Sequence, residues 1–71
     1  MDLCNRLKEI RIQKGLTQEA LAVSVGVTRQ TIIAIEKSKF VPSVKLALEL
    51  ASALDTSLED MFWLGQDKGR N

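Results

Sequence analysis

Histidine is absent from this 71-residue sequence, and cysteine occurs once, at Cys4. A single cysteine forms no disulfide within the chain, which agrees with a reducing compartment, and we interpret Cys4 as a packing residue. Without histidine, the usual transition-metal ligand sets and the Ser-His and Cys-His pairs of nucleophilic catalysis cannot be assembled. The nine acids are scattered, and no glycine-rich phosphate loop is present. We therefore predict that the protein is not an enzyme and uses no metal or cofactor.

Apolar runs long enough to cross a bilayer are also absent, and the start, "MDLCNRLKEI", does not read as a signal peptide. We therefore expect a cytoplasmic protein with no membrane partner. The length allows one small domain. The net charge is only +1, but residues 1–39 carry seven bases and four acids, whereas residues 40–71 carry three bases and five acids. This asymmetry favours one surface that meets an anion.

Strand-like alternation is missing as well, and apolar residues recur at helical spacing. The pattern predicts an all-α domain over residues 1–64 and a flexible polar tail over residues 65–71. Five helices are expected: from Leu3 to Lys14, over "TQEALAVSV", from Thr28 to about Lys37, over "VKLALELASAL" and over "LEDMFWL".

Caps and turns delimit these helices. Thr17 and Thr28 are expected to cap the second and third helices, and Gly26 to adopt the left-handed conformation that ends the second. Ser57 with Asp60 resembles a capping box. The predicted core comprises Leu3, Leu7, Ile10, Leu16, Leu21, Val27, Ile32, Ile35, Val44, Ala47, Leu48, Ala51, Leu54, Leu58 and Phe62.

The stretch "VGVTRQTIIAIEKSKF" contains a helix with two different faces. An advance of about 100° per residue places Ile32 and Ile35 towards the core, and Arg29, Gln30 and Ile33 on the other side. Arginine and glutamine match the edges of guanine and adenine in the major groove, and an exposed isoleucine suits a thymine methyl group. Taken alone, the polar face fits an ordinary solvated surface equally well.

The preceding helix favours the DNA-reading interpretation. "TQEALAVSVGVTRQTI" reads as helix, tight turn at Gly26 and helix, and Ala20 supplies the small side chain that a close helix crossing needs. A helix-turn-helix holds its second helix so that the N-terminal turn projects into the major groove. Gln18, in the first turn of the first helix, is positioned for a phosphate.

With these motifs, the sequence resembles the phage repressor/Cro-like helix-turn-helix family (XRE family), and within it the short stand-alone bacterial and archaeal regulators. The resemblance covers residues 3–64, which contain "GLTQ", the "LA…GV" turn, the "IE" that ends the recognition helix, and "PS…L…LA" in the fourth helix. It implies a five-helix lambda-repressor-like domain that binds a palindromic operator in double-stranded DNA as a homodimer.

The resemblance also implies roles for single residues. The residues that read or approach bases are Arg29, Gln30, Thr31 and Ile33. Those that meet the DNA backbone are Gln18, Thr28, Lys37, Lys39 and Phe40. Arg11 and Glu36 form a structural ion pair between the first helix and the end of the third. Ser38 departs from the glycine of many members, which makes a left-handed helix end there less favourable.

The last expected helix carries four large apolar residues in succession, Met61 to Leu64. Because they point all round a helix, some must be exposed, and exposed apolar patches often mark partner surfaces. We predict a dimer interface made of Leu58, Met61, Trp63 and Leu64. The alternative is that Trp63 only covers the edge of the core.

The predicted function is that of a sequence-specific DNA-binding transcriptional regulator, a repressor, for which no small-molecule effector is expected. The alternative is a protein-interaction module or an antitoxin of the same fold. Binding that weakens steeply with salt would favour DNA, because it reports the neutralisation of phosphates.

Overall fold

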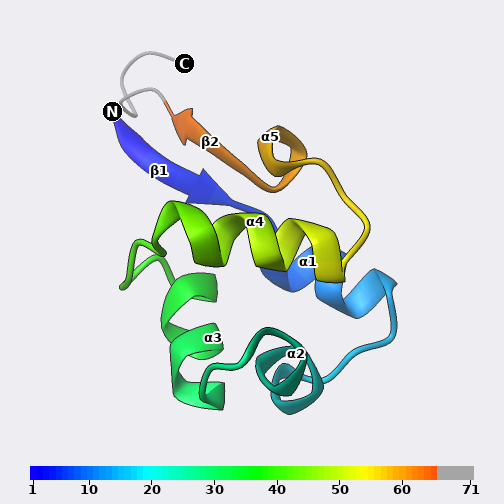
Figure 1. Cartoon of the computed structure of the whole chain (residues 1–71). Coiled ribbons are helices and arrows are strands. Elements are labelled where there is room, and N and C mark those ends of the chain that lie inside the picture. Colours follow the sequence, from blue (N-terminus) through cyan, green and yellow to red (C-terminus); the bar gives the residue numbers. More distant parts are fainter. Residues whose placement is uncertain (66–71) are drawn as a thin grey trace.

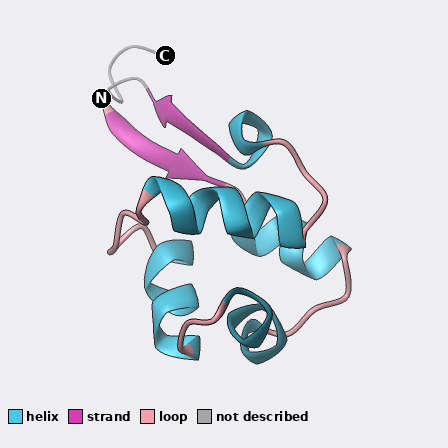
Figure 2. Cartoon of the chain, in the orientation of Figure 1, coloured by secondary structure: helices cyan, strands magenta, loops and turns pink. Residues whose placement is uncertain are grey.

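The computed structural model describes residues 1–65, which form five helices around one core and a two-stranded sheet at one end (Figures 1 and 2). Residues 66–71, which hold most of the predicted polar tail, lie outside the described part. Within residues 1–65, no helix has the length and apolar character needed to cross a membrane. In chain order the elements are β1 (Asp2–Asn5), α1 (Leu7–Gln13), α2 (Gln18–Val25), α3 (Arg29–Glu36), α4 (Val44–Ala53), α5 (Leu58–Met61) and β2 (Phe62–Gly65).

The sheet corrects the prediction of an all-α domain. β1 pairs antiparallel with β2, in a register that joins Asp2 to Gly65 and Asn5 to Phe62. Each strand spans four residues. Alternation over so few positions does not stand out in a sequence, and each strand finds its partner only at the opposite end of the domain. Leu3 therefore lies in a strand, from which it packs against the core, and not in the first turn of a helix.

The fifth helix is shorter than predicted, because the residues after Met61 form β2 and pair with β1. α5 ends at Met61, and Phe62 already has extended backbone, with φ −129° and ψ 140°. Aromatic side chains favour strands, and pairing with β1 supplies the hydrogen bonds that extended backbone needs. The side chain of Ser57 makes no capping hydrogen bond, so the predicted capping box with Asp60 is not formed.

The predicted caps of α2 and α3 are confirmed. Thr17 Oγ1 accepts a hydrogen bond from the N–H of Ala20 at 3.0 Å, and Thr28 Oγ1 accepts one from that of Thr31 at 3.3 Å. Each hydroxyl satisfies one of the N–H groups that the start of a helix leaves without a partner. Gly26 ends α2 in the left-handed conformation, with φ 74° and ψ 31°.

Ser38 is left-handed too, although it carries a Cβ. Its φ is 59°, and the chain turns back after it so that the N–H of Lys39 donates to the carbonyl of Ala34 at 2.8 Å. This is the hydrogen-bond pattern by which helices usually end at glycine. The backbone hydrogen bonds of this helix end therefore accompany a serine conformation that costs a residue with a Cβ about 1–2 kcal/mol.

α4 has apolar residues on more than one side. Leu46 and Leu50 are buried, whereas Val44 is 73% exposed and Leu48 51% exposed. The prediction that Val44 and Leu48 belong to the core is wrong, because leucine, valine and alanine occur all round this helix. Their spacing alone does not identify the side that faces the core.

The core itself lies among the helices and under the sheet. Four of its members are missing from the predicted set although they are at most 9% exposed: Ala22, Leu46, Leu50 and Met61. The large side chains with almost no exposed surface are Leu7, Leu21, Ile32, Ile35, Leu50, Leu54 and Met61.

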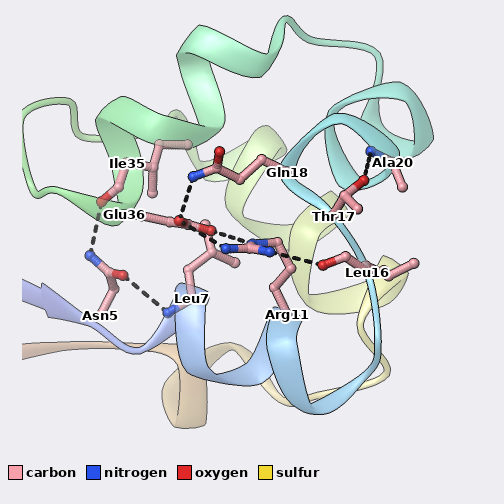
Figure 3. Close-up of polar contacts among 9 residues, drawn as sticks. All are labelled: Asn5, Leu7, Arg11, Leu16, Thr17, Gln18, Ala20, Ile35 and Glu36. Carbon is pink, nitrogen blue, oxygen red and sulfur yellow. Dashed lines mark hydrogen bonds and ion pairs between the residues drawn. The ribbon is translucent and has the colours of Figure 1, made fainter.

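A buried ion pair joins α1 to the end of α3 (Figure 3). Arg11 Nε donates to Glu36 Oε2 at 2.7 Å, and the two side chains are 9% and 4% exposed. Arg11 Nη1 also donates to the carbonyl of Leu16 at 2.8 Å, and Gln18 Nε2 donates to Glu36 Oε1 at 3.1 Å. Residues from α1, from the α1–α2 connection, from α2 and from α3 therefore meet at one pair of charges.

Ser38 and Gly26 both end a helix in the left-handed conformation, one with a Cβ and one without, and this allows a test of backbone strain. Ser38→Gly should raise the free energy of unfolding by about 0.5–1 kcal/mol, because glycine adopts positive φ without strain. Gly26→Ala should lower it by about 1 kcal/mol or more. A Cβ at Gly26 would meet no atom within 4 Å, so this loss would come from the backbone alone. Urea denaturation measures both, and equal effects of one sign would contradict the assignment.

The ion pair allows a test of burial. Glu36→Gln should lower the free energy of unfolding by about 3–5 kcal/mol, because it leaves the Arg11 charge buried without a counter-charge. The matched control is Glu49→Gln, since Glu49 pairs with Lys45 at 3.0 Å with side chains 42% and 83% exposed. That change should cost less than about 0.5 kcal/mol. Similar losses in urea denaturation would show that the burial of Glu36 has no energetic weight.

Candidate nucleic-acid interface

The turn at Gly26 sets α3 across α2. The buried residues of α2 are Leu21 and Ala22, and Ala22 is the small side chain at the core side of this helix. The prediction that Ala20 has this role is wrong. Ala20 is exposed, because it lies about 200° round the helix from Ala22.

α3 has one anchored face and one open face. Ile32 and Ile35 are 0% and 1% exposed and hold the helix to the core. Arg29 and Gln30 are exposed at the opposite side of its first turn. Within residues 1–65, neither side chain forms a hydrogen bond or ion pair with the protein. Their donors and acceptors are therefore available to an external ligand.

The other two candidate base-reading residues are less open. Thr31 and Ile33 are half-buried, so the expectation of an exposed Ile33 is corrected. The hydroxyls of Thr28 and Thr31 lie 3.1 Å apart and share a hydrogen bond. This contact orders the first turn of α3, from which Arg29 also projects.

The segment from Thr28 to Ser43 presents positive charge. Its three bases, Arg29, Lys37 and Lys39, are all exposed. Its only acid is Glu36, whose carboxylate is buried against Arg11. The negative charge within the recognition segment is thus neutralised inside the protein, and the surface formed by this segment favours an anion.

Two further backbone-contact candidates differ in environment. Phe40 is 47% exposed in the connection between α3 and α4. Gln18 is half-buried, because its amide donates to Glu36 Oε1 (Figure 3). A glutamine amide has two N–H groups and a carbonyl oxygen, so contacts among residues 1–65 leave Gln18 one donor for a second partner. The sequence offered no sign of the contact between Gln18 and Glu36, which joins residues on different helices.

The candidate dimer residues do not share one environment. Met61 is 0% exposed and belongs to the core, so its inclusion among the surface residues is corrected. Trp63 is 37% exposed and Leu64 62% exposed, while Leu58 is half-buried. Beside them lies an apolar hollow of about 340 Å³, whose lining includes Leu58, Leu64 and the exposed Val44. Val44 extends this apolar surface onto α4.

Comparison with known proteins also identifies a helix-turn-helix domain. The sequence model of the helix-turn-helix family HTH_3 matches residues 7–61. The chain is 49% identical over 63 residues to the uncharacterised HTH-type transcriptional regulator YgzD of Bacillus subtilis, covering 89% of this chain and 96% of that protein. It is 50% identical over 64 residues to the uncharacterised HTH-type transcriptional regulator MJ0272 of Methanocaldococcus jannaschii, covering 90% and 97%.

Solved structures with a similar fold include the restriction-modification controller protein C.AhdI of Aeromonas hydrophila. The two chains are 37% identical with a TM-score of 0.72, over 76% of this chain and 78% of that one. A putative DNA-binding protein of Bacteroides fragilis has a TM-score of 0.79 over 86% and 98%. At 24% identity, this second likeness concerns the fold alone.

The family match spans the five helices from Leu7 to Met61, and within it lie the helix-turn-helix and its exposed arginine and glutamine. The chain therefore belongs to the helix-turn-helix family HTH_3, the XRE family of DNA-binding transcriptional regulators.

Proposed function

We propose that the protein is a repressor that binds a palindromic operator as a homodimer, with α3 of each copy in the major groove. The observation that carries this proposal is the first turn of α3. Arg29 and Gln30 are exposed there without partners among residues 1–65, on a helix that Ile32 and Ile35 anchor in the core. A rigid helix that presents unengaged hydrogen-bonding side chains meets the requirement for base reading.

Each base-reading residue has a distinct chemical role in this proposal. The guanidinium of Arg29 donates two parallel hydrogen bonds to guanine, and the amide of Gln30 pairs with adenine. Thr31 and Ile33, both half-buried, limit how closely a base edge approaches and offer methyl groups to thymine.

In this proposal, other side chains contact the DNA backbone on both sides of the base-reading residues. Lys37 and Lys39 contact phosphates beyond the end of α3, close to Phe40, and Thr28 does so at its start. Gln18 uses the amide N–H that Glu36 does not occupy. Such contacts set the orientation of α3 without reading sequence.

A homodimer is proposed because one helix-turn-helix contacts only a few base pairs. Two copies about 34 Å apart read two half-sites on the same side of the duplex. The exposed Trp63 and Leu64, beside the apolar hollow, supply a surface for association. Repression then requires only that the dimer occupies a promoter, since a bound dimer excludes the polymerase.

Selection from a random duplex library tests the proposed function. We expect the protein to enrich an inverted repeat whose half-sites lie about one helical turn apart. An enriched single half-site would contradict the homodimer. No enrichment by a folded protein, with binding that salt hardly affects, would favour the alternative of a protein-interaction module.

Two substitutions separate base reading from backbone contact. Arg29→Ala should weaken operator binding by about 1–3 kcal/mol and relax the preference at one base pair, because it removes a bidentate contact. Lys37→Ala should weaken binding to all sequences equally and reduce the salt dependence by about one ion. Titrations of operator and scrambled duplexes at several salt concentrations measure both. A uniform loss for Arg29→Ala would exclude it from base reading.

A further inference from the structure

The two outer edges of the sheet differ. β1 has the α3–α4 connection beside it, since Ser38 and Val41 line a shallow hollow together with Asp2–Asn5. β2 is the strand farther from this connection (Figure 1). An outer strand has a row of N–H and C=O groups that point away from its sheet, and these can pair with another chain.

The register identifies the outward-pointing groups of β2. In an antiparallel pair, residues that exchange hydrogen bonds alternate with residues that do not. The N–H of Arg6 donates to the carbonyl of Met61 at 3.0 Å, so the next hydrogen-bonded pair along the ladder is Cys4 with Trp63. Leu64 and Phe62 fall between these positions and direct their backbone groups outwards. The N–H of Phe62 is already bonded to the carbonyl of Leu58. Among residues 1–65, this leaves the Phe62 carbonyl and both backbone groups of Leu64 without a partner.

We propose that β2 pairs antiparallel with β2 of a second copy, so that one four-stranded sheet runs through the homodimer. This inference rests on the homodimer of the proposed function and specifies its interface. With the two-fold axis at Trp63, Leu64 lies opposite Phe62 of the second copy. The N–H of Leu64 donates to the carbonyl of that Phe62, and the reciprocal bond forms by symmetry.

The side chains of β2 suit a second copy of the same strand. "FWLG" carries no charge and no proline, although these are the usual means by which an edge strand avoids pairing. Two identical strands therefore meet without repulsion between like charges.

The inner face of the sheet offers a fitting contact for this pairing. Leu64 is 62% exposed. In the proposed dimer, Leu64 of one copy contacts Phe62 of the other copy. This contact lies at the apolar hollow of about 340 Å³, whose lining includes Phe62, Leu3 and Leu58. The same contact forms twice, which is the self-complementarity that a two-fold interface requires.

The outer face brings the two Trp63 side chains opposite each other at the axis. Trp63 is 37% exposed, and the Arg6 guanidinium of its own chain lies 4.7 Å from the ring centroid. Cross-strand aromatic pairs of this kind stabilise antiparallel sheets.

The same symmetry suits operator binding. The helices pack against one face of the sheet, towards which Phe62 is buried and Leu3 packs. A two-fold axis between antiparallel neighbours runs perpendicular to the sheet, so both helix bundles lie on the same side of it. Both α3 helices can therefore approach one side of a duplex, as a palindromic site requires.

Amide hydrogen exchange in the wild-type full chain tests the pairing directly. We expect the Leu64 amide to exchange freely at low protein concentration and at least about tenfold more slowly at high concentration, because dimerisation gives it an acceptor. The amides of Gln18 and Glu19 at the start of α2 serve as controls, since a helix start leaves them without backbone acceptors at any concentration.

Disulfide cross-linking tests the position of the axis. Trp63 lies opposite Cys4 within one chain, so the variant combines Trp63→Cys with Cys4→Ser. Residues that face each other across the axis without exchanging hydrogen bonds have Cα atoms about 4.5 Å apart, which a disulfide can span. We expect oxidation to give a covalent dimer in high yield. The control combines Lys45→Cys with Cys4→Ser, because Lys45 is exposed on α4, and it should give little dimer.

Sedimentation of the wild type separates the two levels of the proposal. A dimer whose Leu64 amide stays unprotected would overturn pairing through β2 and leave the homodimer standing. A chain that stays monomeric at all concentrations would overturn both. A Leu64 amide that becomes protected while the cross-link fails in a folded variant would exclude the axis at Trp63. If circular dichroism shows that the variant does not fold, exchange in the wild type decides the pairing.

Discussion

The contact between the Glu36 carboxylate and the Arg11 guanidinium puts two opposite charges into a nearly dry space between α1 and α3. Neither charge is stable there alone, because the desolvation of an unpaired ion costs several kcal/mol. The pair recruits further donors and acceptors, the amide of Gln18 and the carbonyl of Leu16. Only the native arrangement of α1, α2 and α3 satisfies all of them, so the orientation of the recognition helix depends on this contact.

The same contact shapes the outer surface. Because Glu36 is neutralised inside, Arg29, Lys37 and Lys39 face solvent without an acid of their own segment beside them. Gln18 is bound to the carboxylate from one side and has an N–H left on the other. Stability and the capacity to meet an anion therefore depend on one group, which ties the folding of the helix-turn-helix to its proposed role.

At the other end of the molecule, the sheet joins the two ends of the described chain and covers the core. Pairing of β1 with β2 brings Leu3 and Phe62 onto the core side and leaves Trp63 and Leu64 partly exposed. The protein thus has a basic surface on α3 and the connection after it, and an apolar surface on β2. The proposed homodimer on DNA needs both, and the separation between them lets each contact form without blocking the other.

The sequence by itself determined the helix-turn-helix. Thr17, Thr28 and Gly26 act on backbone groups within four residues along the chain, so their effects can be read locally, and the family resemblance carried by the same motifs is confirmed. Only the tertiary structure decided that Leu3 lies in a strand, that Met61 is buried and that α4 turns Leu46 and Leu50 inwards in place of Val44 and Leu48. These outcomes depend on which distant segments pack together. Apolar spacing shows that a side chain needs a partner, but it does not say which partner the fold brings to it.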